Sequence, residues 1–326
     1  MYPEGYELNW IHHGLVFQPP KKLWWTQSHA QCPVIDPTQL ACGRYRIYFS
    51  SRDKQGKSRI GSALLCPDSF NVQLEKQSPS LELGITGRFD DAGVMPACVI
   101  PVLGSSKLLY IGWMERKSVP YQNAIGLATI NREDGELKRD YPGPVLTAWA
   151  NEAYFTGTIH VIPAAGQFQA YYLSCVEWSN HNGRIEPRYD LKIARSTDLV
   201  NWQRMSKPAL ELETESEGGY ASAAILKLSK GYLMFYCMRG AKDYREDPIQ
   251  SYKIYTATSK DALNWTKTNQ PLFNMPPEFA NQMQCYPQFL ILKDRLVLFY
   301  NGNDFGRSGF GCSSINLNDL EQLWKT

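Results

Sequence analysis

No apolar run in the 326-residue sequence is long enough to cross a membrane as a helix. The N-terminal stretch Met1–Gly5 lacks a basic region followed by an apolar core, so we expect no secretory signal. The net charge is only +2, which gives no electrostatic footprint for nucleic acid or an anionic membrane. We therefore expect a globular protein with no membrane span and no nucleic-acid partner.

Paired cysteines are missing as well, because the eight Cys are spread singly and none form a Cys-x-x-Cys pair. Several, such as Cys98 and Cys237, lie inside apolar runs, where a free Cys behaves as a small hydrophobic residue. The sequence also lacks the His and Cys spacing of metal sites and the Gly-rich loop that cradles phosphate. We expect reduced thiols, a cytoplasmic location, and neither a metal nor a cofactor.

Aromatic residues are abundant at 13%, which favours strands over helical bundles. A strand pattern rich in aromatics recurs at Tyr48, Tyr110, Tyr172, Tyr236 and Tyr300. The intervals between these anchors are about 62, 62, 64 and 64 residues, a self-similar spacing that marks repeat folds. Each anchor lies in a second strand candidate. An apolar run precedes it as the first candidate, and a third candidate follows it. A Ser/Asp turn ending in Trp, at 196–202 and at 259–265, supplies a fourth.

Four short strands repeated five times predict an all-β fold, a five-bladed β-propeller with four-stranded antiparallel blades around a central funnel. A solenoid would need polar capping repeats, which we do not find. The repeats predict one domain over residues 1–326. Residues 1–28 form its closing segment, because Gly14–Phe17 is a plausible outer strand for the last blade.

In a propeller, the loops that enter the innermost strands converge at one end of the central channel. Nineteen residues before each anchor stand His29, Asp91, Ala153, Glu217 and Asn281, and a slip of one residue in the third repeat brings Glu152 into line. Asp and Asn also favour turns for backbone reasons alone. Carboxylates crowded around one funnel would shift one another's pKa values, as acid/base chemistry requires. Asp91, Glu152 and Glu217 are therefore the catalytic candidates, and Asp90 can exchange roles with Asp91.

The segment Tyr45–Leu64 resembles the first blade of the five-bladed glycosidases and glycoside phosphorylases of family 130, which are related to families 43 and 32. Gly93-Val94 before a Pro-containing strand, the Ser-x-Asp-Leu-x-x-Trp element at 196–202, and Tyr300–Asp304 add to the resemblance. It implies a carbohydrate partner, either an oligosaccharide or a glycoside. Where family 130 members carry an acidic residue before the Pro, this sequence has Met95.

Glycoside cleavage usually needs one protonated carboxyl and one ionised carboxylate. The resemblance implies Glu152 as general acid, because its place in the third blade is similar to that of the family 43 acid. Asp91 is then the base or a neighbour that sets the pKa, and Glu217 holds sugar hydroxyls or exchanges roles with Glu152. His29 stands where family 43 has an Asp base, and it is a candidate for that role because imidazole titrates near neutrality.

The remaining candidates are substrate-binding residues. Aromatic side chains can act as sugar platforms or as packing between blades, and these are Tyr154, Tyr220, Tyr286 and Trp149. Polar side chains that can face the funnel are Arg59, Arg88, Arg239 and Asp304.

Three functions are compatible with the sequence. A glycoside hydrolase is favoured. The alternatives are a glycosyl-transferring enzyme of polysaccharide metabolism, either a phosphorylase or a transferase, and a carbohydrate-binding propeller with an eroded catalytic set.

Overall fold

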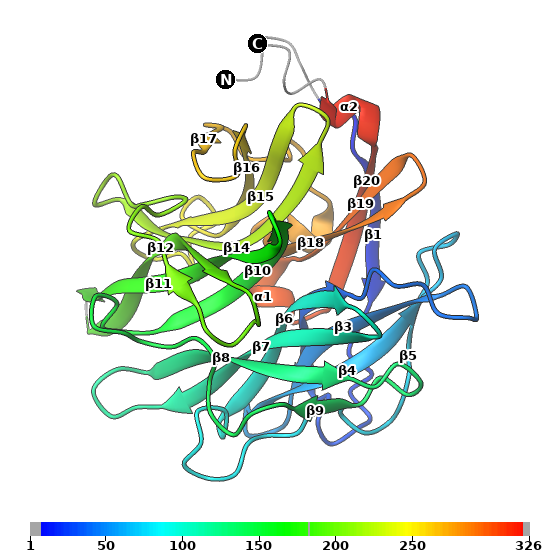
Figure 1. The fold of residues 1–326 in the computed structure, drawn as a ribbon, viewed down its shortest axis with the longest axis horizontal. Coiled ribbons are helices and arrows are strands. Elements are labelled where there is room, and N and C mark those ends of the chain that lie inside the picture. The colour runs from blue at the N-terminus through cyan, green and yellow to red at the C-terminus, as the bar shows by residue number, and fades with distance from the viewer. Residues whose placement is uncertain (1–7, 182, 322–326) are drawn as a thin grey trace.

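The computed structural model describes residues 8–181 and 183–321. Its strands form three hydrogen-bonded sheets, one of four strands and two of eight (Figure 1). Helices in the described ranges are limited to short pieces, which are η1 (Glu278–Ala280), α1 (Asn303–Gly306) and α2 (Leu317–Glu321). The prediction of an all-β chain is confirmed.

Antiparallel pairing divides the strands into five groups of four, which we call units I to V. Unit I contains β2 (Ser28–Ile35), β3 (Tyr45–Arg52), β4 (Ser58–Leu65) and β5 (Val72–Leu74). Unit II contains β6 (Gly93–Val102), β7 (Ser105–Glu115), β8 (Tyr121–Ile130) and β9 (Leu137–Arg139). Unit III contains β10 (Thr156–Ala164), β11 (Gln167–His181), β12 (Arg184–Ser196) and β13 (Gln203–Arg204). Unit IV contains β14 (Glu217–Leu228), β15 (Gly231–Gly240), β16 (Lys253–Ser259) and β17 (Thr266–Lys267). Unit V contains β18 (Cys285–Leu292), β19 (Arg295–Asn301), β20 (Phe310–Asn316) and β1 (Ile11–Phe17).

Unit V is built from both ends of the sequence. β1 pairs antiparallel with β20, with Leu15 opposite Gly311, and the two strands run side by side in Figure 1. This is the outer position that the sequence predicts for Gly14–Phe17. The N-terminal strand therefore ties the first part of the chain to the last.

The first strands of the units contact one another in a closed cycle, from β2 to β6, β10, β14, β18 and back to β2. Apolar side chains fill the seams between neighbouring units. Each of the five buried clusters holds residues of two successive units, for example Phe299 and Ile47, Tyr48 and Tyr110, Ile125 and Tyr172, Tyr171 and Tyr236, and Phe235 and Tyr300. All five anchor tyrosines of the repeat are buried. The period found in the sequence is therefore the period of the hydrophobic core.

Every first strand loses its regular register with the second strand at one level. The breaks lie at Gln31/Val34, Pro96/Cys98, Thr156/Ile159, Ala221/Ala224 and Cys285/Gln288. A β-bulge inserts a residue, bends the strand and re-aims side chains, and such bulges occur often next to active sites. The five breaks thus mark a level at which side chains turn toward the centre of the cycle.

Candidate functional site

A small cavity lies at the level of the bulges, and all five first strands contribute to its wall. Its volume is about 20 Å³, and it is lined by Cys32, Val34, Pro96, Ala97, Thr158, Ile159, Ser222, Ala223, Tyr286 and Gln288. A space this small holds about one water molecule. We call it the axial floor, because side chains close the centre of the cycle here.

Backbone strain occurs in the first strands that form this floor. Residues with a left-handed backbone occur in three first strands, at His29 (φ 62°), Cys32 (φ 52°), Ser222 (φ 55°) and Tyr286 (φ 56°). Each such non-glycine residue costs about 1–3 kcal/mol, and this strain tends to cluster at functional sites. The strain and the bulges together point to the centre of the cycle as the candidate site.

Cationic side chains gather above the floor, where first strands begin and second strands end. Burial lowers the pKa of Arg52, and the positive charges of Arg245 and Arg307 lower it further. Arg52 Nε donates to Gln31 Oε1 at 3.1 Å. In the described ranges no carboxylate lies within ion-pair distance of Arg52 or Arg307. Uncompensated guanidinium groups of this kind are well suited to bind carboxylate or phosphate.

His29 lies beside this cluster, and we call His29, Arg52, Arg245 and Arg307 the axial mouth. Burial lowers the pKa of His29 to about 3, and the charges of Arg52 and Arg307 add to the effect. Its Nδ1 lies 2.8 Å from Ser28 Oγ, and its side chain is buried. The imidazole is therefore neutral at neutral pH, and does not titrate there as the sequence suggested.

We expect acid to destabilise the protein through His29. The folded-state pKa of about 3 lies below the ordinary value of 6.5, so this stability is present above pH 6.5 and is lost as pH falls toward 3. Between pH 7 and pH 5 the loss should be about 2 kcal/mol of unfolding free energy. Urea denaturation of His29→Gln at both pH values should show a smaller loss. The matched comparison is the same substitution at His160. Burial lowers the pKa of His160 to about 4, and this residue lies away from the mouth. An equal loss of unfolding free energy between pH 7 and pH 5 in the wild type and in His29→Gln would contradict the assignment.

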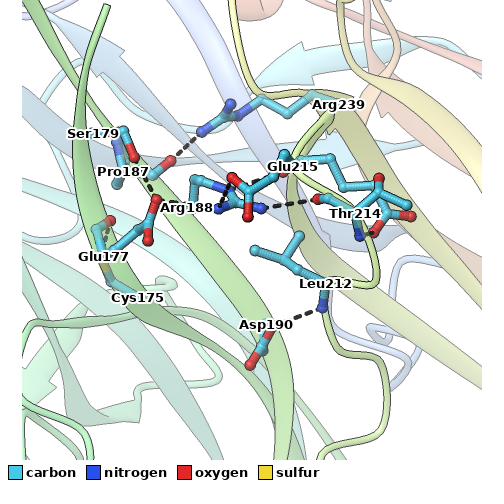
Figure 2. Close-up of polar contacts among 11 residues, drawn as sticks. Cys175, Glu177, Ser179, Pro187, Arg188, Asp190, Leu212, Thr214, Glu215 and Arg239 are labelled. Carbon is cyan, nitrogen blue, oxygen red and sulfur yellow. Dashed lines mark hydrogen bonds and ion pairs between the residues drawn. The ribbon is translucent and has the colours of Figure 1, made fainter.

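One wall of the mouth is built around Arg239, which is only 2% exposed. Its Nε donates to Tyr189 OH at 2.9 Å and Tyr252 OH at 3.2 Å. Its Nη2 donates to Pro187 O (Figure 2). The guanidinium carbon also lies 3.9 Å from the ring centre of Tyr244. All three nitrogens of Arg239 have protein partners, so this side chain holds the wall together and has little capacity left for a ligand.

Among the described residues, Glu186 is the single buried carboxylate in that wall. Tyr244 OH donates to its Oε2 at 2.6 Å, and Arg245 Nε lies 3.2 Å from its Oε1. Burial alone would raise the pKa of Glu186, but the hydrogen bonds from Tyr244 and Arg245 lower it overall. Glu186 is therefore ionised, and it orients Arg245 toward the mouth.

A second arginine fixes the segment that leads into β14. Arg188 Nη1 lies 3.1 Å from Glu177 Oε1, and its Nη2 donates to Thr214 O at 2.9 Å (Figure 2). Its Nε donates to the backbone oxygen of Glu217 at 3.1 Å. These bonds join β12 to the start of β14 and hold Glu217 at the mouth end of unit IV.

The three predicted catalytic carboxylates have separate partners. Asp91 accepts one hydrogen bond, from Gly87 N to Oδ2 at 2.8 Å, and its Oδ1 has no hydrogen-bond partner among the described residues. Asp91 and Glu217 both lie at the mouth end, next to the start of β6 and at the start of β14. Nothing in the described structure bridges them, and neither shares a partner with Glu152. Their catalytic roles stay predictions.

Asp90 and Glu152 have equivalent surroundings in successive units. Asp90 is fully buried; Tyr110 OH donates to its Oδ2 at 3.1 Å, and Arg139 Nε lies 2.7 Å away. Glu152 accepts from Tyr172 OH at 2.9 Å and Ser174 Oγ at 3.1 Å, with Arg204 Nε 3.4 Å from Oε1. In both units an acid from the preceding linker joins the anchor Tyr to an Arg of the outermost strand. Asp90 and Glu152 therefore make the same structural contact in successive units.

Glu217 is held in a similar way. Tyr220 OH donates to its Oε1 at 2.7 Å, and the backbone N–H groups of Glu213 and Thr214 donate to Oε2 at 2.6 and 3.2 Å. Burial would raise the pKa of Glu217, but these bonds lower it overall. Tyr220 is fully buried and also accepts from Lys267 Nζ at 2.9 Å, so its ring is not an open sugar platform.

The other predicted binding residues lie at different places. Tyr286 reaches the axial floor. Arg88 lies half-buried on the turn that carries Asp91, where its backbone oxygen accepts from Asp91 N at 3.4 Å. Asp304 is exposed in α1, three residues before Arg307. Tyr154 is 40% exposed at the start of unit III.

Glu152 also lies in the wall of a groove of about 900 Å³ along the seam between units II and III. Arg204, Lys192 and Trp202 line the same groove, and Trp149 stands 66% exposed at its edge. This groove is separate in its lining residues from the axial mouth.

The described residues near the mouth include no metal site and no thiol nucleophile. Among the described residues, no group of three or more His, Cys, Asp or Glu side chains could hold a metal ion. All eight Cys are free thiols. Burial raises the pKa values of Cys32, Cys237 and Cys285 beneath the mouth, so they are protonated and unreactive. No helix in the described part of the chain is long and apolar enough to cross a bilayer.

No protein-family model matches the sequence. Two relatives are uncharacterized proteins of Mycobacterium tuberculosis, from strains CDC 1551 and H37Rv. Each is 29% identical over 309 residues, which covers 94% of this chain and 99% of the relative. The similarity extends over almost the whole of both chains but brings no known activity with it.

Solved structures show what the fold is similar to. A protein described as a glycoside hydrolase matches with a TM-score of 0.71 and 17% identity, over 94% of this chain and 92% of that one. A glycoside hydrolase family 130 structure, described as targeting β-1,2-mannosidic linkages in Candida mannan, matches with a TM-score of 0.69 and 16% identity, over 98% and 96%. The β-1,2-mannobiose phosphorylase of Listeria innocua matches with a TM-score of 0.70 and 14% identity, over 98% and 100%. The predicted resemblance to this superfamily is confirmed at the level of the fold.

Sequence reasoning missed the side chains that form most of the mouth. The predicted site residues precede each anchor Tyr and lie in the loop before the first strand. Arg52 instead follows its anchor, four residues after Tyr48 at the end of the second strand. Glu186, Arg245 and Arg307 lie near or in connections whose lengths differ between units, so no fixed offset could have found them.

Proposed function

We propose that this chain is a carbohydrate-active enzyme, a single five-bladed propeller of units I to V, that acts at the axial mouth on a substrate or co-substrate carrying negative charge. One observation carries the proposal: Arg52 and Arg307 stand without a carboxylate partner beside a neutral, buried His29. Keeping like charges together in the folded protein is unfavourable, and an anion bound between them would relieve it. The confirmed fold supports a carbohydrate as the other reactant.

Glycosyl transfer to or from a phosphate-bearing molecule fits this mouth better than hydrolysis. Hydrolysis needs a second carboxylate to activate water or to attack the sugar. An oxyanion of phosphate is already a nucleophile, so one acid that protonates the departing oxygen is enough. Arginines that bind phosphate also position it for attack. We assign Asp91 as that acid, because its Oδ1 is not engaged by the described residues.

Hydrolysis is the second candidate, and the placement of two carboxylates favours it. Asp91 and Glu217 both lie at the mouth end of first strands, in units II and IV. Product analysis separates the two reactions. A hydrolase releases free sugar from a glycoside in buffer without phosphate, whereas a transferring enzyme forms product only when phosphate or a phosphorylated sugar is supplied.

Replacing Arg52 by Gln tests the anion site. Loss of one charged hydrogen bond costs about 1.5–3 kcal/mol, so the affinity for inorganic phosphate or a sugar 1-phosphate should fall about 10- to 150-fold by calorimetry. The melting temperature without ligand should stay equal or rise, because the substitution removes repulsion from Arg245 and Arg307. Arg295→Gln, at the opposite end of β19 from the mouth, is the control. If phosphate neither binds the wild-type protein nor raises its melting temperature, the proposal is wrong.

A further inference from the structure

A second depression opens between the hairpin tips of units II and III. Its volume is about 510 Å³, and its wall comes from residues 116–121 of the β7–β8 connection, 183–186 at the start of β12, and Arg245. We call it the rim groove. Ligand sites are commonly about 300–1,000 Å³, so the rim groove is large enough to bind several sugar units or an equivalent ligand.

Positive charge predominates in the rim groove, where Arg184 is paired with Glu246 at 2.6 Å and Arg245 with Glu186 at 3.2 Å. Its lining holds four cations, Arg116, Lys117, Arg184 and Arg245, against the single carboxylate of Glu186. The entire chain carries a net charge of only +2, so positive charge is concentrated here. Arg116 and Lys117 are exposed, and no carboxylate within the described ranges lies within ion-pair distance of either. These two cations are available to a ligand.

The rim groove and the axial mouth share one side chain, Arg245. Arg245 lines the groove and also acts electrostatically on Arg52. Glu186 orients Arg245 from the groove side. A ligand bound in the groove next to Arg245 therefore lies beside a side chain of the axial mouth.

The rings around the groove favour a saccharide over a nucleobase. Tyr121 is the one aromatic side chain in the described lining. Its ring packs against Trp113, Phe155 and Trp178, at centroid distances of 4.6, 5.5 and 5.3 Å. A base would need an open aromatic face to stack on, and this ring is already packed. The remaining lining is polar, cationic or small and aliphatic.

We propose that the rim groove binds an anionic saccharide chain, in which carboxylates or phosphates recur along the sugar backbone. This proposal rests on the proposed function, because it places the rest of the same substrate beyond the axial mouth. Arg116 and Lys117 contact successive negative groups of the chain. The reacting sugar then lies at the mouth, under Arg245. The enzyme is thereby selective for acidic glycans over neutral ones.

The test compares chains of equal length and different charge. An oligouronate hexamer and a phosphodiester-linked sugar oligomer are the anionic probes, and a neutral glucose hexamer is the uncharged probe. Binding to the full-length protein is measured by calorimetry at low and at physiological salt. At least one anionic probe should bind at least about tenfold more tightly than the neutral hexamer, with affinity falling as salt rises. The probe that binds identifies whether carboxylates or phosphates are recognised.

The double variant Arg116→Glu/Lys117→Glu should weaken that binding by about tenfold or more. The control, Lys227→Glu/Lys230→Glu, makes the same change of charge at the β14–β15 turn, at the opposite end of unit IV from the mouth, and should have no effect. Circular dichroism melting of both variants shows whether they are folded. The proposal is overturned if neither anionic probe binds better than the neutral one, or if the two double variants weaken binding equally.

These outcomes are separable from a failure of the proposed function. Inorganic phosphate reports on the mouth through the wild-type protein and Arg52→Gln. If phosphate has no effect while the oligomer responds to the substitutions at Arg116 and Lys117, the groove is an anion site on a protein with another activity. If phosphate binds through Arg52 and the substitutions in the groove leave the affinity for the oligomer unchanged, only the groove proposal is wrong.

Discussion

Replacing Asp91 by Asn should lower kcat by about 100- to 10,000-fold, the usual contribution of a general acid. Asp91 is half-buried at the mouth end of unit II, and among the described residues its side chain has one hydrogen bond, from Gly87 N to Oδ2 at 2.8 Å. Asn keeps the shape and can keep that bond, but it cannot give a proton to a departing sugar oxygen. Turnover of the aryl glycoside or sugar phosphate that the wild-type protein uses fastest is the measurement.

Two other amide substitutions provide the contrast. Glu152 and Glu217 have both carboxylate oxygens engaged by protein donors. Glu152→Gln and Glu217→Gln should therefore lower the free energy of unfolding by about 1–3 kcal/mol and affect kcat less than Asp91→Asn. A wild-type kcat in Asp91→Asn would remove Asp91 from the chemistry. Loss of kcat with retained sugar binding in Glu152→Gln or Glu217→Gln would restore those carboxylates as catalytic groups.

The fold was accessible from the sequence because the repeat is a consequence of packing. The anchor tyrosines recur because each one fills the same buried position between neighbouring units, and a fixed spacing in sequence reports a fixed spacing in structure. The outer strand supplied by Gly14–Phe17 was predictable for the same reason, since the last unit was one strand short. Register breaks were not predictable, because bulges depend on how the first strands crowd together at the centre.

The candidate site was harder to predict from the sequence than the fold, because polar residues in turns stabilise the structure as well as carry out chemistry. The offset of nineteen residues predicts Asp91 and Glu217, whereas Glu152 lies twenty residues before its anchor Tyr and matches Asp90 in its contacts. At Glu152 and Glu217, however, the carboxylate bonds the anchor Tyr or a neighbouring Tyr. Local sequence cannot tell an acid that bonds a buried tyrosine from one that faces a ligand. The charged mouth depends on Arg245 and Arg307, which come from connections without a repeat.

Arg239→Met should be the most destabilising of the substitutions considered, lowering the free energy of unfolding by about 3–5 kcal/mol. Arg239 is nearly fully buried, and Tyr189, Tyr252, Pro187 and Gly240 all accept hydrogen bonds from it. Met fills much of the same space but donates nothing. It would leave two buried hydroxyls and two carbonyl oxygens without this donor. Urea denaturation followed by tryptophan fluorescence gives the measurement.

The predicted loss of unfolding free energy follows from how the charge of Arg239 is stabilised without a carboxylate partner. The described structure shows no carboxylate within ion-pair distance of it, and its charge is balanced by the faces of Tyr244 and Tyr189, at 3.9 and 4.9 Å from the ring centres. Such contacts can be worth about 2 kcal/mol when they are desolvated. Arg239→Lys keeps the charge but loses the planar fork, so it should fall between wild type and Arg239→Met. If Arg239→Met is as stable as wild type but loses ligand affinity, Arg239 serves the ligand and not the wall, as the sequence first suggested.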